Sequence, residues 1–324
     1  MKVVIIGAGF VGAACAKAML LRGSCHEIIL LDTKVSKLRD KETGEEREIR
    51  RDAGVATDLS HGELLCPPTR VRHGGYKDLA DASVIVITAG INEQAGNAID
   101  REDNRGRLLL LPKNAEIYQE IIPRIVSVAP EAPILVVTDP PDALADIARN
   151  LTNTNPILSS GTFLDSLRFR FQVARRLECH PSSVEALVIG EHGTSQVYVW
   201  SSARIGGVPV LEHVARRGWD TVSFKTDVER AVKYANIDII EGTGASQHAI
   251  GIVTARIVEA MLRDEGLVEP VGAYQPKYDV TFSLPAVIGR GGVSAVWEPS
   301  LSDEESGALA ASAAFIKAAL AGIL

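Results

Sequence analysis

Residues 3–12 read Val-Val-Ile-Ile-Gly-Ala-Gly-Phe-Val-Gly, and this stretch decides the fold. A short apolar strand runs directly into a Gly-x-Gly-x-x-Gly turn, and an alanine-rich helical segment follows. In such a turn the first glycine permits the tight bend, the second lets the backbone approach a pyrophosphate, and the third lets the helix pack closely on the strand. The pattern predicts a dinucleotide site at the helix N-terminus, where free N–H groups attract phosphate. Its residues are Gly7, Gly9, Phe10, Val11 and Gly12.

An acidic residue at the end of the next apolar run supports this prediction. Asp32 closes Ile28–Leu31 and lies 20 positions beyond Gly12, where a carboxylate can accept hydrogen bonds from ribose hydroxyls. Its charge would repel a 2′-phosphate, so the sequence favours NAD over NADP as the cofactor. Two alternatives stay open: Asp32 is a plain strand-end turn residue, or a nearby basic cluster reaches a 2′-phosphate. That cluster is Arg47, Arg50 and Arg51.

The first half of the chain alternates short β-branched runs with helical stretches. Runs that are apolar on both faces indicate buried parallel strands, and their alternation with helices predicts a Rossmann-type, doubly wound parallel sheet of the α/β class. Ligands bind such a sheet outside the carboxyl ends of its strands. The expected strands are Val3–Ile6, Ile28–Leu31, Val84–Thr88 and Ile134–Thr138.

The second half has a different pattern, typical of a mixed α/β domain. Helices are expected over Leu164–Leu177 and Ala245–Arg263, and a strand over Ala186–Ile189. The run Val197–Ile205 breaks at Gly206-Gly207 and resembles a hairpin. We therefore expect a cofactor domain over residues 1–158 and a substrate-binding, catalytic domain over 159–324.

Composition limits the partners and the setting. The 324 residues carry a formal net charge of −7, with a pI near 5.6, which gives no broad attraction to nucleic acid or to anionic membranes. The N-terminus begins as a strand rather than a signal peptide, and no apolar run approaches the roughly 20 residues of a membrane span. Sparse cysteines without metal-ligand spacing favour a reduced, cytoplasmic setting. They are Cys15, Cys25, Cys66 and Cys179.

One segment of the first half is dense in both charge signs. Residues 34–51 have no clear apolar period, and Glu42-Thr43-Gly44-Glu45 near their centre has turn character. We interpret the segment as a solvated protrusion without a chemical role.

The segment Ile189-Gly190-Glu191-His192-Gly193 is the strongest candidate for catalysis. A histidine between glycines after an apolar strand is well placed for proton transfer, because an unperturbed imidazole titrates near neutral pH. Upstream, Asp165 and Arg168 are spaced i and i+3 on a helix and project to one side. The carboxylate could orient His192, and the guanidinium could bind a substrate carboxylate through two parallel hydrogen bonds. Taken alone, this pair is also compatible with a surface ion pair.

The order of these motifs resembles the L-lactate/malate dehydrogenase family, nearly from end to end. Besides the glycine turn and the Gly190–Gly193 segment, several ordered segments match. They are Asp58-Leu59-Ser60-His61-Gly62, Thr88-Ala89-Gly90, Lys113-Asn114, Val199-Trp200-Ser201 and Pro285-Ala286-Val287-Ile288.

The resemblance implies a role for each matching residue. His192 would be the general acid/base, Asp165 its orienting partner, Arg168 the carboxylate clamp and Arg107 the loop arginine that polarises the substrate carbonyl. Ser246 stands where the family places a threonine beside the substrate. No metal is required, because the two arginines supply the electrophilic stabilisation. Further cofactor contacts are implied for Thr88, Ala89, Gly90, Asn114 and Thr138.

The implied reaction is hydride transfer between NAD and an L-2-hydroxy acid. The partner is thus a small 2-oxo or 2-hydroxy acid, and the family implies a homodimer or homotetramer. The glycines around His192 and the Gly161-Thr162 pair resemble the lactate side of the family more than the malate side, and the long loop 91–107 resembles its L-2-hydroxyisocaproate branch. A non-catalytic, NAD-sensing module on the same scaffold is an alternative from another class.

Two departures from the family pattern concern the substrate. Asp139 stands where the family has an asparagine, and its charge would repel a substrate carboxylate. Alternatively, burial favours the protonated form, and the neutral acid would donate a hydrogen bond. The loop 91–107 is long, and it carries the position that sets substrate choice. Alignment from its left end places Glu93 there, which would reject a dicarboxylate, whereas alignment from its right end places Arg101 there, which would suit one and so favour malate dehydrogenase activity.

Overall fold

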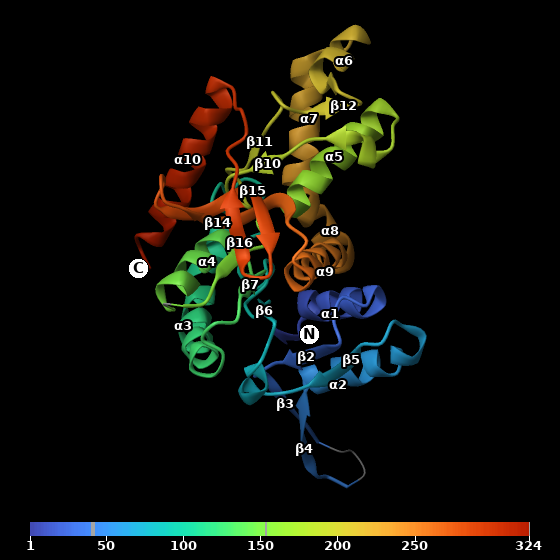
Figure 1. Cartoon of the computed structure of the whole chain (residues 1–324), viewed down its shortest axis with the longest axis vertical. Coiled ribbons are helices and arrows are strands. Elements are labelled where there is room, and N and C mark those ends of the chain that lie inside the picture. The colour runs from blue at the N-terminus through green and yellow to red at the C-terminus, as the bar shows by residue number, and fades with distance from the viewer. Residues whose placement is uncertain (40–42, 153, 324) are drawn as a thin grey trace.

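The computed structural model describes residues 1–39, 43–152 and 154–323. Among these residues one nine-stranded sheet runs through the molecule, in the order β16-β15-β14-β8-β7-β6-β1-β2-β5 (Figure 1). The strands from β8 to β5 are parallel, as predicted, and β14 to β16 are antiparallel. The sheet strands are β1 (Lys2–Ile6), β2 (Glu27–Leu31), β5 (Arg70–His73), β6 (Val84–Ile87), β7 (Ile134–Val136), β8 (Ile157–Ser159), β14 (Leu267–Gln275), β15 (Val280–Gly289) and β16 (Gly292–Val296).

Helices cover both faces of the parallel strands, and each face has its own apolar layer. One layer packs the sheet against α3 (Leu111–Val128), α4 (Pro141–Asn150) and α10 (Asp303–Leu320). The other packs it against α1 (Phe10–Arg22) and α9 (His248–Arg263), which lie against each other. Burial on both sides explains why β1, β2, β6 and β7 are almost entirely apolar.

The second half contributes a lobe with a third apolar cluster. Its core lies among α5 (Phe163–Leu177), α6 (Val210–Arg216) and α7 (Thr221–Lys233). Phe169 and Trp200 meet edge to face there, with ring centroids 4.6 Å apart. The remaining elements are α2 (Arg51–Ser60), α8 (Ala235–Thr243), β9 (Val184–Glu185), β10 (Val188–Ile189), β11 (Val197–Tyr198), β12 (Arg204–Ile205), β13 (Val208–Pro209) and the 3-10 turns Glu63–Leu65, Tyr76–Leu79, Gly106–Leu110 and Pro181–Ser183.

Several predicted elements of the second half are shorter than expected. The strand at 186–189 is β10 alone, and β9 precedes it as a separate strand. The run 197–205 is divided between β11, which pairs with β10, and β12, which forms a hairpin with β13 through Gly206-Gly207. Both glycines have positive φ, which a two-residue turn of this kind requires. The helix expected from 245 begins only at His248, because Gly244 ends α8 in the left-handed region.

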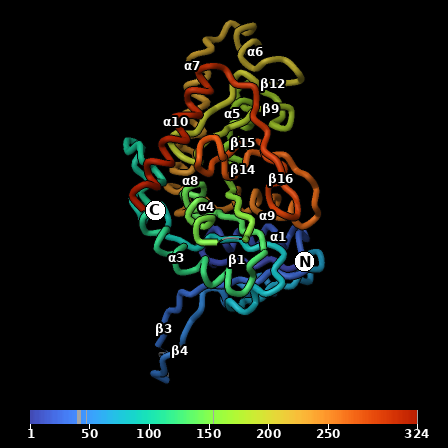
Figure 2. Tube along the Cα trace, turned by 60° about the vertical axis from the view of Figure 1, so that its left-hand side comes forward, coloured from blue at the N-terminus to red at the C-terminus, as the bar shows by residue number. Residues whose placement is uncertain are grey.

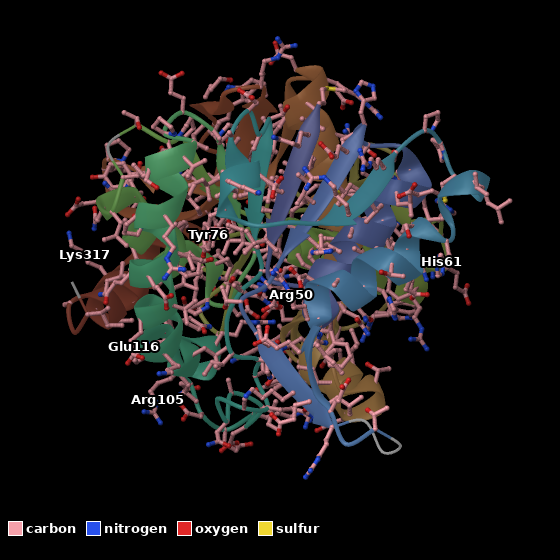
Figure 3. All side chains as sticks on the ribbon, turned by 90° about the horizontal axis from the view of Figure 1, so that it is seen from below. Arg50, His61, Tyr76, Arg105, Glu116 and Lys317 are labelled. Carbon is pink, nitrogen blue, oxygen red and sulfur yellow. The ribbon has the colours of Figure 1, made fainter. Side chains whose placement is uncertain are left out.

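Two short strands within the charged segment 34–51 form a ribbon that projects away from the body (Figures 1 and 2). Its strands β3 (Val35–Arg39) and β4 (Glu46–Arg50) pair antiparallel and belong to no larger sheet. The protrusion was predicted but its strands were not. The predicted turn at 42–45 is described only from Thr43 onward. Arg50, at the base of the ribbon (Figure 3), ties it to the body by donating to the buried carboxylate of Asp52 at 2.6 Å.

Within the part of the chain that the structure describes, no helix combines the length and the apolarity needed to cross a membrane.

Candidate active site

The glycine turn between β1 and α1 has the geometry of a pyrophosphate cradle. Gly7 has φ +107°, and a Cβ there would lie 2.6 Å from the backbone nitrogen of Ala89. A Cβ on Gly12 would lie 1.9 Å from the carbonyl oxygen of Gly7, so neither position tolerates a side chain. A Cβ on Gly9 would meet nothing within 4 Å, so the second glycine faces open space. Since the first turn of α1 carries no acidic residue, the residues present fit a dinucleotide.

Asp32 lies beside this cradle at the end of β2. Its carboxylate accepts hydrogen bonds from the backbone nitrogens of Ala8, at 2.9 Å, and Lys34, at 2.8 Å. Of the basic cluster, Arg51 lines the cleft and stacks over Phe10 at 5.2 Å, whereas Arg50 is paired with Asp52. An acidic residue at this point supports the predicted preference for NAD.

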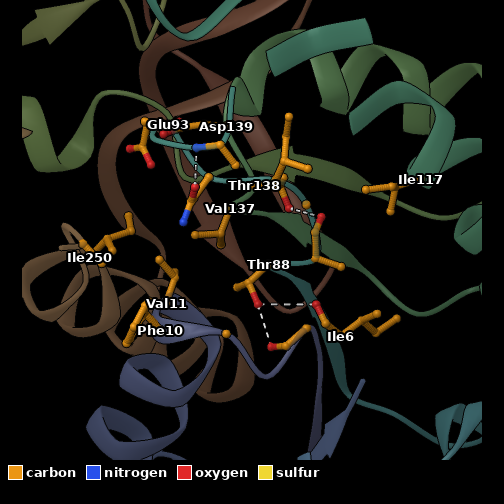
Figure 4. A pocket seen from close by; sticks show the side chains of 18 of the residues that line it. Ile6, Phe10, Val11, Thr88, Glu93, Ile117, Val137, Thr138, Asp139 and Ile250 are labelled. Atoms are coloured by element: carbon orange, nitrogen blue, oxygen red, sulfur yellow. Dashed lines mark hydrogen bonds between the residues drawn. The ribbon is translucent and has the colours of Figure 1, made fainter. Parts of the chain in front are cut away.

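A cleft of about 560 Å³ runs from the glycine turn to the second-half lobe. Figure 4 shows Phe10, Val11 and Thr88 toward α1, and Glu93 and Asp139 together at the other end. Most of the residues singled out from the sequence line it. They are Gly7, Gly9, Phe10, Val11, Asp32, Thr88, Ala89, Gly90, Glu93, Arg107, Thr138, Asp139, Arg168, His192 and Ser246.

Four predicted site residues do not line the cleft. Gly12 packs beneath the turn, and Asp165 lies behind His192. Asn114 is fully buried and holds two cleft segments in place, because it accepts from the nitrogen of Ile91 at 2.8 Å and donates to the carbonyl of Asp139 at 2.7 Å. Arg101 is the fourth, and it points to a different part of the molecule.

His192 follows β10, and its ring connects two side chains from other elements. Nδ1 is hydrogen-bonded to Oδ2 of Asp165 on α5, and the other oxygen of that carboxylate accepts from Nη1 of Arg168 at 3.0 Å. Burial alone would raise the pKa of Asp165, but the neighbouring His192 and Arg168 lower it well below its usual range. Asp165 is therefore an ionised acceptor that fixes the imidazole with Nε2 free for chemistry.

Asp142 on α4 is a residue that sequence reasoning missed. Its carboxyl group is buried, with Oδ2 accepting from the backbone nitrogen of His192 at 2.8 Å and Oδ1 accepting from Oγ of Ser159 at 2.6 Å. It thus positions the backbone of His192. Burial raises the pKa of Asp142 from its ordinary 3.8 to about 7, and the two hydrogen bonds offset this only in part. The sequence Asp-Pro-Pro-Asp at residues 139–142 places a second carboxylate close to Asp139 and could have pointed to Asp142. It also has the composition of an ordinary helix start, so it did not distinguish a site residue.

Asp142 gives a prediction about stability against pH. Because its folded pKa is raised, its contribution to stability is full below pH 3.8 and is lost as pH rises through about 7. Asp142→Asn keeps an acceptor for His192 and removes the ionisation. We therefore expect the melting temperature of the variant to fall less between pH 5 and pH 8 than that of the wild type. Thermal unfolding at both pH values measures this, with the exposed Asp58→Asn as control; an unchanged pH dependence would contradict it.

The loop 91–107 brings Arg107 over the cleft. Arg107 Nε donates to Oδ2 of Asp139 at 3.0 Å, and Oδ1 of Asp139 lies 3.7 Å from Nε2 of His192. Burial would lower the pKa of Arg107, but Asp139, Asp165 and Glu93 raise it, so the guanidinium stays charged. Burial and the charge of Asp139 raise the pKa of Glu93.

Arg101, from the same loop, contacts the outside of α8 instead of the cleft. It donates to Glu241 and to Asp238, both at 2.7 Å, while the hydroxyl of Tyr234 donates to its carbonyl at 3.3 Å. Arg101 therefore does not line the cleft, where one of the two alignments placed it, because two carboxylates on α8 hold the guanidinium at the surface. The alignment that placed Glu93 there agrees with the cleft.

Comparisons with known proteins agree with this geometry. The lactate/malate dehydrogenase NAD-binding domain matches residues 1–157, and the lactate/malate dehydrogenase alpha/beta C-terminal domain matches residues 162–323. An L-lactate dehydrogenase of Deinococcus radiodurans is 39% identical, over 98% of this chain and 97% of the relative, and one of Thermus aquaticus is 37% identical, over 100% and 99%. The crystal structure of a minor L-lactate dehydrogenase from Enterococcus mundtii has a TM-score of 0.85 at 30% identity, covering 100% of this chain and 98% of that one.

These matches identify an NAD-dependent oxidoreductase that acts on the CH–OH group of a 2-hydroxy acid. The chain belongs to the lactate/malate dehydrogenase family.

Proposed function

We propose that the chain interconverts a monocarboxylic L-2-hydroxy acid of the lactate type and its 2-oxo acid. The observation that carries this is the acidic side chain of Glu93 in the cleft, with Arg101 turned away to α8. A second carboxylate on the substrate would meet Glu93 and Asp139 without a cation of its own, because Arg168 takes the first carboxylate and Arg107 the carbonyl oxygen, and like charges in a partly buried site repel strongly. This disfavours oxaloacetate and malate.

Each side chain has a separate task in this proposal. Arg168 binds the substrate carboxylate, and Arg107 stabilises the negative charge that develops on the carbonyl oxygen. His192 Nε2 takes the hydroxyl proton during oxidation and returns it during reduction, while Asp165 stabilises the imidazolium. When bound, the nicotinamide accepts or supplies the hydride.

A substrate panel tests the proposal. With NADH, we expect kcat/KM for pyruvate or 2-oxoisocaproate to exceed that for oxaloacetate by at least about tenfold, since one unpaired carboxylate costs more than 1.4 kcal/mol. Arg101→Gln should leave this order unchanged, because Arg101 lies outside the cleft. Preferred turnover of oxaloacetate, lost selectively in Arg101→Gln, would instead establish the malate alternative.

We further propose a homodimer or homotetramer in a reduced, cytoplasmic setting. Leu64 and Leu65 are 95% and 94% exposed next to α2, and a second copy would remove them from water. Free cysteines agree with the setting. Light scattering measures the number of subunits.

The division of the chain into residues 1–158 and 159–324 is also a proposal. The family matches, which end at 157 and begin again at 162, support it. The single sheet that joins both halves, through the pairing of Gly272 with Ser159, means that the two parts share one core.

A further inference from the structure

The carboxylate of Asp139 lies between the two groups that act on the reacting oxygen. Oδ2 accepts from Arg107 Nε at 3.0 Å, and Oδ1 lies 3.7 Å from His192 Nε2. All three side chains are at most one-fifth exposed. The backbone of Asp139 is held by Asn114, whose amide donates to its carbonyl, so this position is fixed from behind.

The chemistry of the proposed reaction requires the same place for the substrate. As the 2-oxo acid is reduced, its carbonyl oxygen gains negative charge and then a proton. It must therefore come within hydrogen-bond distance of both a guanidinium N–H and the proton on Nε2. In the structure these two donors face Asp139. An oxygen of the substrate and an oxygen of Asp139 cannot both take the hydrogen bond from Nε of Arg107.

Neighbouring charges do not relieve this competition. Asp165 and Glu93 are further carboxylates around the same cations, and the contact of Arg168 goes to Asp165 rather than to Asp139. An uncharged amide at position 139 would accept a weaker hydrogen bond from Arg107, because charge-assisted hydrogen bonds are roughly twice as strong as neutral ones. The carboxylate is thus the feature that ties Arg107 down.

We propose that Asp139 is an internal competitor of the substrate, a specificity-determining residue that occupies Arg107 until a 2-oxo acid displaces it. This inference rests on the proposed function. Only the fraction of molecules in which Arg107 is released binds substrate productively, so the apparent affinity is reduced by that fraction. The chain consequently accepts only substrates whose carbonyl and carboxylate together outcompete its own side chain.

The test is Asp139→Asn, which keeps the shape of the side chain and removes its charge. We expect KM for pyruvate to fall about tenfold without a fall in kcat, corresponding to an arginine that is free about one-tenth of the time in the wild type. The affinity of the NADH complex for oxamate, an unreactive analogue, should rise by the same factor. Asp103→Asn is the matched control, because Asp103 pairs with Arg105 on the same loop at 2.7 Å, outside the cleft.

The outcomes separate this inference from the proposed function. If KM and the oxamate dissociation constant are unchanged or higher in Asp139→Asn, Asp139 does not compete with the substrate and the proposal is overturned. A fall in kcat also overturns it, because Asp139 would then take part in the chemistry. The same improvement in Asp103→Asn also overturns it, because the effect would then belong to the loop. Oxamate binding reports on the competition even if no 2-oxo acid is turned over, whereas absence of turnover in the wild type contradicts only the proposed function. Thermal unfolding confirms that each variant is folded.

Discussion

Replacing His192 with asparagine should lower kcat for the reduction of pyruvate by about 10²- to 10⁴-fold, the usual contribution of a positioned acid or base. Nδ1 is hydrogen-bonded to Asp165, so Nε2 is the ring nitrogen that faces the cleft and carries the proton. An asparagine can still contact Asp165 but cannot titrate near neutral pH. Steady-state kinetics at saturating NADH measures the loss.

The cofactor provides the control for this prediction. The cradle at Gly7 and Gly9 lies on a different loop, so NADH should bind His192→Asn with the wild-type affinity, measured by its fluorescence. His73→Asn, at the exposed end of β5, should keep full activity. If His192→Asn retains more than about a tenth of wild-type kcat, another group transfers the proton.

Local patterns were sufficient to predict four of the parallel strands in the first half, but not β5 or β8. The strands β1, β2, β6 and β7 are buried on both faces, and their apolar, β-branched composition carries that information directly. The dinucleotide turn could also be predicted, because its first and third positions exclude any side chain for steric reasons and therefore require glycine.

The sequence could not show how the second half joins the first. Strands β14 to β16 extend the cofactor sheet through a single pairing of Gly272 with Ser159, more than a hundred residues apart. No periodicity encodes which edge a strand will join. The role of Asp142 could not be predicted for the same reason, because its contact with His192 requires α4 to lie against the end of β10.

The loop 91–107 shows a different limit. Its two alignments placed either Glu93 or Arg101 at the substrate, and both residues are plausible by composition. The structure separates them because Asp238 and Glu241, on a helix far along the chain, hold Arg101. In the proposed function, the choice between lactate-type and malate-type substrates thus depends on residues outside the loop 91–107.

Arg168 provides the second large effect that we expect. It is 12% exposed on α5, and Asp165 holds one of its terminal nitrogens at 3.0 Å, which leaves its other N–H donors for a carboxylate in the cleft. A guanidinium binds a carboxylate through two parallel hydrogen bonds in a fixed plane, whereas an ammonium is a point charge. Charge alone is therefore insufficient at this position.

Arg168→Lys should raise KM for pyruvate by about 10²- to 10³-fold, since hydrogen bonds to charged groups contribute roughly 1.5–3 kcal/mol each and the ammonium cannot reproduce the parallel pair. Pyruvamide, which lacks the carboxylate, should lose far less, so the preference for the acid over the amide should collapse. Arg170→Lys is the matched control, because Arg170 lies on the same helix but pairs with Glu269 outside the cleft. If pyruvate and pyruvamide lose equally, Arg168 acts by holding Asp165 and His192 in place rather than by binding the substrate.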